Sequence, residues 1–187
     1  MALEQAMNNT AENNWYREYV TFTTEKKFSD LLREAYKQAW YHSDDDSTKT
    51  GVLLVDKKLK ILVKTNNHFP PGTGQIPGAL ERPKKYTINN HAERAAVYKA
   101  AKKGIKTEGL IMIMPWAPCL PCANAIIYSG INKLVCHKQM VDRTLEDWRP
   151  ELRDAFHLLK VNNIKILMYD GKIGRCRGIF RHIEWQP

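Results

Sequence analysis

Four side chains form a pattern that can bind a metal ion and move a proton. Glu93 follows His91 by two residues, and Cys119 and Cys122 belong to a Pro-Cys-Leu-Pro-Cys segment. One imidazole and two thiolates supply three ligands of a tetrahedral zinc ion and leave the fourth position for water. Zinc lowers the pKa of such a water toward about 7. The residue types and spacing therefore predict a catalytic metal site.

The expected local structure suits these roles. Cys119 and Cys122 are three residues apart, so at the start of a helix both sulfurs project to one side, where the helix dipole favours thiolates. Glu93 lies about 200° around a helix from His91, so we do not expect it to be a ligand on the same face. Its carboxylate can instead take a proton from water and return it to a leaving amine. This chemistry is hydrolytic deamination of a heteroaromatic base.

The full pattern H-x-E…P-C-x-x-C is the signature of zinc nucleobase deaminases. Two other interpretations are a zinc ribbon and a redox dithiol. A ribbon leaves Glu93 without a task, and a redox pair leaves both His91 and Glu93 unexplained. Four residues are candidates for the additional ligand that a ribbon needs: His68, Cys136, His137 and Cys176.

The elements that position these residues alternate between helices and strands. Three- and four-residue apolar spacing predicts a helix over 25–42, and two short apolar runs predict a hairpin. Four prolines and three glycines within 65–90 predict a long loop that walls a pocket. We expect strands at 52–55, 61–64, 109–114, 133–136 and 164–169, and later helices at 91–103, from near 119, and at 145–161. This order indicates an α/β domain with parallel pairing in its second half.

Length and composition limit the alternatives. The 187 residues fit one domain, and 43% hydrophobic with 26% charged residues excludes wholesale disorder. We expect an N-terminal extension over 1–24, a domain over 25–170 and a basic tail over 171–187, packed on the domain or extending from it. No apolar run reaches the roughly 18 residues of a membrane span, and no leader is evident, so we expect a soluble, cytoplasmic protein. The net charge of +9 favours an anionic partner, although a solvated basic surface is the simpler interpretation.

The sequence resembles the cytidine/deoxycytidylate deaminase superfamily, and most of all its zinc-dependent deoxycytidylate (dCMP) deaminases. The resemblance is strongest in two segments, HAERAAVYKAAKKGI and PWAPCLPCANAIIYSGINKLV. Weaker similarity lies in 46–52 and 65–72, so that the resemblance spans roughly 25–170. It implies a three-layer α/β/α fold with a mixed sheet of about five strands. It also implies one catalytic zinc ion per chain, bound by His91, Cys119 and Cys122, with Glu93 as the proton shuttle.

Substrate contacts follow from two sources. The resemblance implies that Asn67 contacts the sugar and that backbone groups around Trp116 and Ala117 meet the cytosine edge. The basic loop before His91 adds candidates for a 5′-phosphate contact, with an aromatic residue as a wall for base or sugar. These loop residues are Arg82, Lys84, Lys85 and Tyr86.

The resemblance implies conversion of dCMP to dUMP and ammonia, in support of thymidylate synthesis. It also suggests a homo-oligomer, with a hexamer as the expected form. One alternative is a deaminase acting on a cytosine or adenine in single-stranded nucleic acid, favoured by the +9 charge and the aromatic N-terminal segment. A second is a non-catalytic nucleotide-binding protein with a deaminase fold.

Overall fold

The structure is a computed structural model that describes residues 15–187. The strands are β1 (Val20–Thr23), β2 (Gly51–Val55), β3 (Ile61–Asn66), β4 (Ile111–Ile113), β5 (Lys133–His137), β6 (Lys165–Tyr169), β7 (Gly178–Phe180) and β8 (Ile183–Trp185). The α-helices are α2 (Lys26–His42), α3 (Lys84–Ile88), α4 (Ala92–Lys102), α5 (Leu120–Tyr128), α6 (Lys138–Val141) and α7 (Arg149–Val161). Three 3-10 helices complete the set, namely η2 (Arg17–Tyr19), η3 (Thr73–Gln75) and η4 (Glu146–Trp148).

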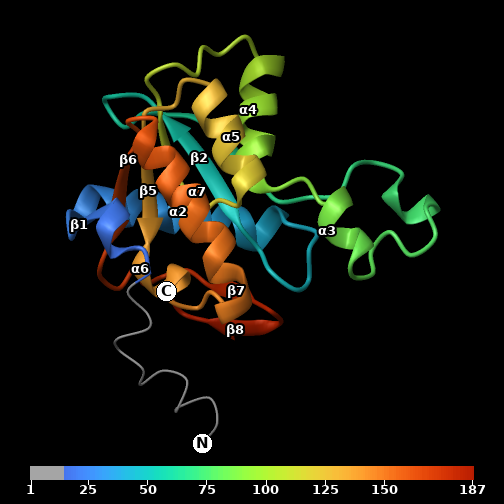
Figure 1. Cartoon of the computed structure of the whole chain (residues 1–187). Coiled ribbons are helices and arrows are strands. Elements are labelled where there is room, and N and C mark those ends of the chain that lie inside the picture. Colours follow the sequence, from blue (N-terminus) through green and yellow to red (C-terminus); the bar gives the residue numbers. More distant parts are fainter. Residues whose placement is uncertain (1–14) are drawn as a thin grey trace, which may run out of the picture.

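A mixed six-stranded sheet, in the order β1-β6-β5-β4-β2-β3, forms the centre of the molecule (Figure 1). The first four of these strands pair in parallel, whereas β2 is antiparallel to both β4 and β3. The predicted parallel pairing in the second half is confirmed. The predicted number of about five strands is wrong by one, because β1 adds a strand at the edge of the sheet.

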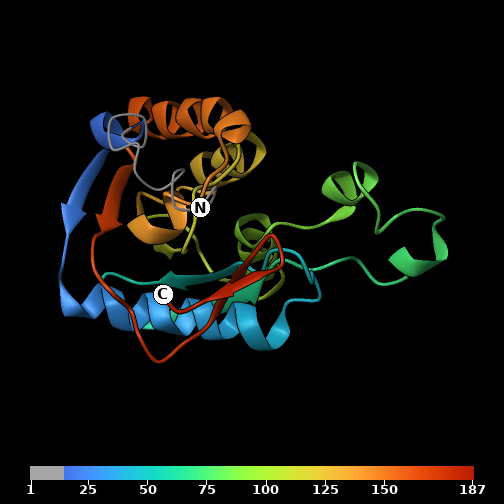
Figure 2. The same cartoon turned by 90° about the horizontal axis from the view of Figure 1, so that it is seen from below.

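Helices cover both faces of the sheet, which confirms the predicted three-layer α/β/α fold. The helix α2 runs along one face, and α4, α5 and α7 lie on the other (Figure 2). The alternation of strand side chains explains this arrangement. Val52 and Leu54 pack in the core beneath α4, α5 and α7, whereas Leu53 and Val55 pack against α2.

The contact between α2 and the sheet depends on a glycine. A Cβ at Gly51 would lie 2.1 Å from the carbonyl oxygen of Ala35 in α2. Only a residue without a side chain allows the helix to approach β2 this closely. The predicted helix over 25–42 and the predicted hairpin are both found, as α2 and the β2–β3 pair.

The sequence prediction and the structure differ at the N-terminus. Residues 1–14 of the predicted extension lie outside the described residues, but 15–23 belong to the domain. Trp15 and Tyr16 are buried in the core, and β1 pairs in parallel with β6. The sequence signal of β1 is weak because this strand has four residues and is fully buried at none of them.

Two further segments lie outside the six-stranded sheet, namely residues 67–90 and the C-terminal residues 171–187. Residues 67–90 project from the layers and contain η3 and the short helix α3, so the expected loop is only partly irregular (Figures 1 and 2). The predicted C-terminal tail forms a β7–β8 hairpin, and its Trp185 ring stacks on His137 with a centroid separation of 6.0 Å. Within residues 15–187, no helix combines the length and apolarity needed to cross a membrane.

Candidate active site

The three predicted metal ligands come together where two neighbouring helices begin. His91 and Cys119 are the N-cap residues of α4 and α5, and both have extended backbone angles that direct them off the helix ends. Cys122 lies in the first turn of α5, where Pro121 is tolerated because the first turn needs no backbone donor. The two helices pack against each other, so their N-termini meet.

The distances among these donors fit a zinc ion. His91 Nδ1 lies 3.4 Å from Cys119 Sγ and 3.6 Å from Cys122 Sγ, and the three donor atoms lie within 4.8 Å of one another. Tetrahedral bonds of about 2.3 Å to sulfur and 2.0 Å to nitrogen would place such atoms about 3.6 Å apart. The donor set is therefore of the right kind and spacing for zinc, with one coordination position left for a small ligand.

The electrostatics of the two cysteines favour a cation. Their shared hydrogen bond lowers the pKa of Cys119 well below that of a free thiol and raises the pKa of Cys122. The pair therefore tends to share one proton, and a bound cation would displace it. The N-terminal end of α5 adds a positive potential that stabilises a thiolate.

Glu93 lies beside this ligand group without being part of it. It occupies the first turn of α4, is 5% exposed and lines the same cavity as His91 and Cys119. Burial raises the pKa of its carboxyl above the usual range, although the nearby His91 lowers it. A buried carboxyl with a raised pKa holds a proton more readily than an exposed one, which suits a group that accepts and returns a proton.

The zinc-ribbon interpretation requires a fourth protein ligand, and residues 15–187 supply none. The group of donors contains only His91, Cys119 and Cys122. His68 Nδ1 lies 2.9 Å from the carbonyl oxygen of Asn66, and His137 Nδ1 lies 2.8 Å from the Tyr36 hydroxyl. Of the two other cysteine candidates, Cys136 belongs to a core cluster and Cys176 packs against another, and neither is part of the donor group. The open position favours a catalytic site over a structural one.

A cavity of about 810 Å³ opens beside the metal ligands and is lined on one side by aromatic residues. Trp116, Ala117 and Tyr86, all predicted contacts, are among the lining residues. The rings of Trp116 and Trp148 stack with centroids 5.5 Å apart, and Trp116 Nε1 donates a hydrogen bond to Thr144. A flat wall of this kind suits a planar base. Its second member, Trp148, was not among the contacts predicted from the sequence.

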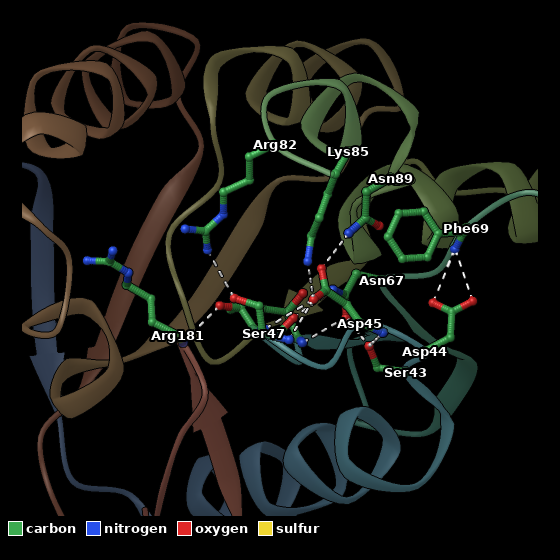
Figure 3. Close-up of polar contacts among 12 residues, drawn as sticks. Ser43, Asp44, Asp45, Ser47, Asn67, Phe69, Arg82, Lys85, Asn89 and Arg181 are labelled. Atoms are coloured by element: carbon green, nitrogen blue, oxygen red, sulfur yellow. Dashed lines mark hydrogen bonds and ion pairs between the residues drawn. The ribbon is translucent and has the colours of Figure 1, made fainter. Parts of the chain in front are cut away.

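Asn67 also lines the cavity, but most of its side chain is engaged in the protein (Figure 3). Its Oδ1 accepts hydrogen bonds from the Ser43 hydroxyl and from Thr50 N, and its Nδ2 donates to the Thr48 carbonyl. These bonds hold the 43–50 segment against the end of β3. One amide hydrogen of Asn67 is not used by them.

The three predicted basic contacts have different positions. Arg82 lines the cavity, and its Nη2 donates to the Ser47 hydroxyl at 3.3 Å. Lys85 also lines the cavity but is paired with Asp45, at 2.7 Å (Figure 3). Lys84 is not among the lining residues, and its Nζ donates to the Pro77 carbonyl. The structure therefore brings two of the three to the cavity.

Sequence reasoning missed Asp45, which organises this side of the cavity. The carboxylate is 4% exposed and accepts hydrogen bonds from Lys85, from Asn89 Nδ2 and from the backbone nitrogen of Ser47 (Figure 3). Its place in the Asp-rich segment 43–51 indicates only a turn. Arg181 of the C-terminal hairpin was also missed, although it lines the cavity.

The structure combines a mixed α/β sheet with a His/Cys/Cys group at two helix N-termini and a buried glutamate beside that group. The protein is therefore an α/β protein with a candidate catalytic zinc site. Residues 25–138, more than half of the chain, match the family described as the cytidine and deoxycytidylate deaminase zinc-binding region. The chain therefore belongs to this family.

Sequence relatives agree with this assignment, and a solved structure shares the fold. A deoxycytidylate deaminase of Enterobacteria phage T2 is 40% identical over 76 residues, which are 38% of this chain and 40% of that protein. An uncharacterised deaminase of Aliivibrio fischeri is 33% identical over 54% of this chain and 65% of its own length. The chain thus matches less than half of the phage relative. The dCMP deaminase of cyanophage S-TIM5 shares the fold, with a TM-score of 0.56 at 18% identity over 78% of this chain and 99% of that one.

Proposed function

We propose that this protein is a zinc-dependent hydrolase that converts dCMP to dUMP and ammonia. The observation that carries the proposal is the placement of the buried Glu93 carboxyl in one cavity with His91 and Cys119, which form a donor group with Cys122. The similarity to a phage deoxycytidylate deaminase supports the choice of substrate. In a cell, the product would supply thymidylate synthesis.

Glu93 would carry the proton transfers of this reaction. Zn²⁺ bound by His91, Cys119 and Cys122 would supply Lewis-acid chemistry that lowers the pKa of a water molecule. The Glu93 carboxylate accepts a proton as the water oxygen bonds to C4 of cytosine. Glu93 then gives the proton to the exocyclic nitrogen, and the C4–N bond breaks to release ammonia. The buried position of Glu93 keeps this proton from exchanging freely with bulk water.

The remaining cavity residues would orient the nucleotide. Trp116 and Trp148 offer a flat wall to the base, and backbone groups at Trp116 and Ala117 would meet its polar edge. The free amide hydrogen of Asn67 would contact the sugar. Tyr86 closes the aromatic side, with its ring 6.1 Å from that of Trp148.

Ammonia release from a panel of substrates tests this proposal. Zinc-loaded protein is assayed with deoxycytidine, dCMP, dCTP and a short single-stranded oligonucleotide, each at two salt concentrations. We expect dCMP to give the highest kcat/KM. Turnover confined to the oligonucleotide, with a steep loss of affinity at higher salt, would favour the nucleic-acid alternative. Failure to release ammonia from all four would favour the non-catalytic alternative.

We further propose that the protein acts as a homo-oligomer, with a hexamer as the expected form. The proposal rests on the family resemblance, since related deaminases complete their pockets across subunits. Sedimentation velocity of the active protein measures the assembly directly. A stable monomer with full activity would refute this part of the proposal.

A further inference from the structure

The C-terminal hairpin brings a second arginine to the cavity, far in sequence from the first. Arg181 occupies the turn between β7 and β8, lines the same cavity as His91 and Glu93, and is exposed. Its backbone nitrogen donates to Thr48 Oγ1 at 3.1 Å (Figure 3). The next backbone nitrogen, of His182, donates to the Ser47 carbonyl at 2.8 Å. The main chain thus fixes the turn, and the Arg181 guanidinium takes no part in that attachment.

The positive charges of this cavity fall into two groups. Lys85 is neutralised by Asp45, and Arg94 Nη2 donates to the Asn89 carbonyl. None of the three arginines, Arg82, Arg94 and Arg181, forms an ion pair with a carboxylate of residues 15–187. Arg94 lies in the first turn of α4 beside Glu93, whereas Arg82 and the Arg181 turn both contact Ser47. Two arginines that face one cavity without a carboxylate partner leave a site for an external anion.

Ser47 lies between these arginines and can add a further donor. Its Oγ accepts the hydrogen bond from Arg82, and its carbonyl holds the Arg181 turn through His182. The hydroxyl hydrogen of Ser47 is therefore free to point at an anion. Figure 3 shows both guanidinium groups on the same side of Ser47, with Asp45 and Lys85 on the other.

We propose that Arg181 binds the 5′-phosphate of the nucleotide together with Arg82, and thereby determines the preference for a nucleotide over a nucleoside. This inference rests on the proposed function, because it names the substrate group that the same cavity recognises. Arg181 lies outside residues 25–138, which match the family, so the contact comes from a part of the chain beyond that match. A forked guanidinium suits a phosphate better than a point charge does, because it can donate two parallel hydrogen bonds.

The test compares Arg181→Asn with Arg177→Asn. Asparagine tolerates the left-handed backbone of Arg181, whose φ is 52°, so the substitution removes the guanidinium without straining the turn. Arg177 lies in the same C-terminal segment, over the Trp40 ring, and is not among the lining residues, so its variant loses the same charge elsewhere. Calorimetry measures binding of dUMP and of deoxyuridine, and steady-state assays give kcat and KM for dCMP.

We expect Arg181→Asn to weaken dUMP binding and to raise the KM for dCMP by about tenfold or more, with deoxyuridine binding and kcat unchanged. Arg177→Asn should match the wild type in every assay. Unchanged dUMP affinity in Arg181→Asn would overturn the inference, and so would an equal loss for deoxyuridine, which would indicate a structural role. Phosphate-dependent binding through Arg181 without any dCMP turnover would instead refute the proposed function and leave the phosphate contact standing.

Discussion

The Asp45 carboxylate provides a quantitative test of how the cavity wall is held. It is 4% exposed, and it pairs with Lys85 at 2.7 Å and accepts a hydrogen bond from Asn89 at 2.8 Å. Asp45→Asn keeps the shape of the side chain but removes its negative charge. It also places the amide NH₂ group, itself a donor, beside the groups that donate hydrogen bonds to Asp45. Removing one partner of a buried ion pair costs about 3–5 kcal/mol. Because 13% of the Lys85 side chain remains exposed to water, we expect the lower end, about 3 kcal/mol.

Urea unfolding of four proteins separates the ion pair from its surroundings. The set is the wild type, Asp45→Asn, Lys85→Met and the double variant. Methionine keeps the volume of the lysine stem while removing its charge. We expect the double variant to be less destabilised than the sum of the singles by about 1–3 kcal/mol, since each single variant leaves one group unpaired. A loss below about 1 kcal/mol in Asp45→Asn, or additive losses, would refute the account of this wall.

Three further predictions concern packing, acid stability and metal. Gly51→Ala should destabilise the protein by about 1–3 kcal/mol in urea, because its Cβ would meet the Ala35 carbonyl at 2.1 Å, whereas Gly74→Ala, with open space around it, should change stability by less than about 0.5 kcal/mol. Burial lowers the pKa of His137 to about 4, so the unfolded chain takes up the proton first and stability should fall by up to about 3 kcal/mol between pH 7 and pH 4. His137→Gln should show a smaller fall, and an equal fall would contradict this origin. Chelation should abolish turnover, with recovery on addition of Zn²⁺ but not Mg²⁺, because thiolates select the softer ion.

The chemistry-bearing residues could be predicted from the sequence because their spacing alone brings them together. His91, Cys119 and Cys122 each begin a helix or lie in its first turn. The strands β3 and β4, which precede these helices, are both antiparallel to β2 and so run in the same direction, and the two helices begin at the same end of the sheet. The amphipathic period of α2 was equally clear, because its apolar residues repeat along one face.

The missed features depend on contacts between segments far apart in the chain. The strands β7 and β8 have three residues each, and their turn uses positive φ angles at Arg181 and His182, which sequence rules associate with Asn and Gly. The Asp45 to Lys85 pair spans 40 residues and joins a turn to a loop helix. Neither contact leaves a periodic signal in the sequence, so Arg82 and Lys85 could be predicted at this wall of the cavity but Asp45 and Arg181 could not.

The most direct test of the central claim is a paired measurement on Glu93→Gln, comparing zinc content with the rate of ammonia release from dCMP. Glutamine keeps the size of the side chain but cannot shuttle a proton. Because Glu93 lies outside the donor group, the variant should retain one zinc ion per chain while its kcat falls by about 10²–10⁴-fold. An unchanged kcat, or loss of the zinc together with the activity, would contradict the assignment of Glu93 as a proton shuttle beside the metal.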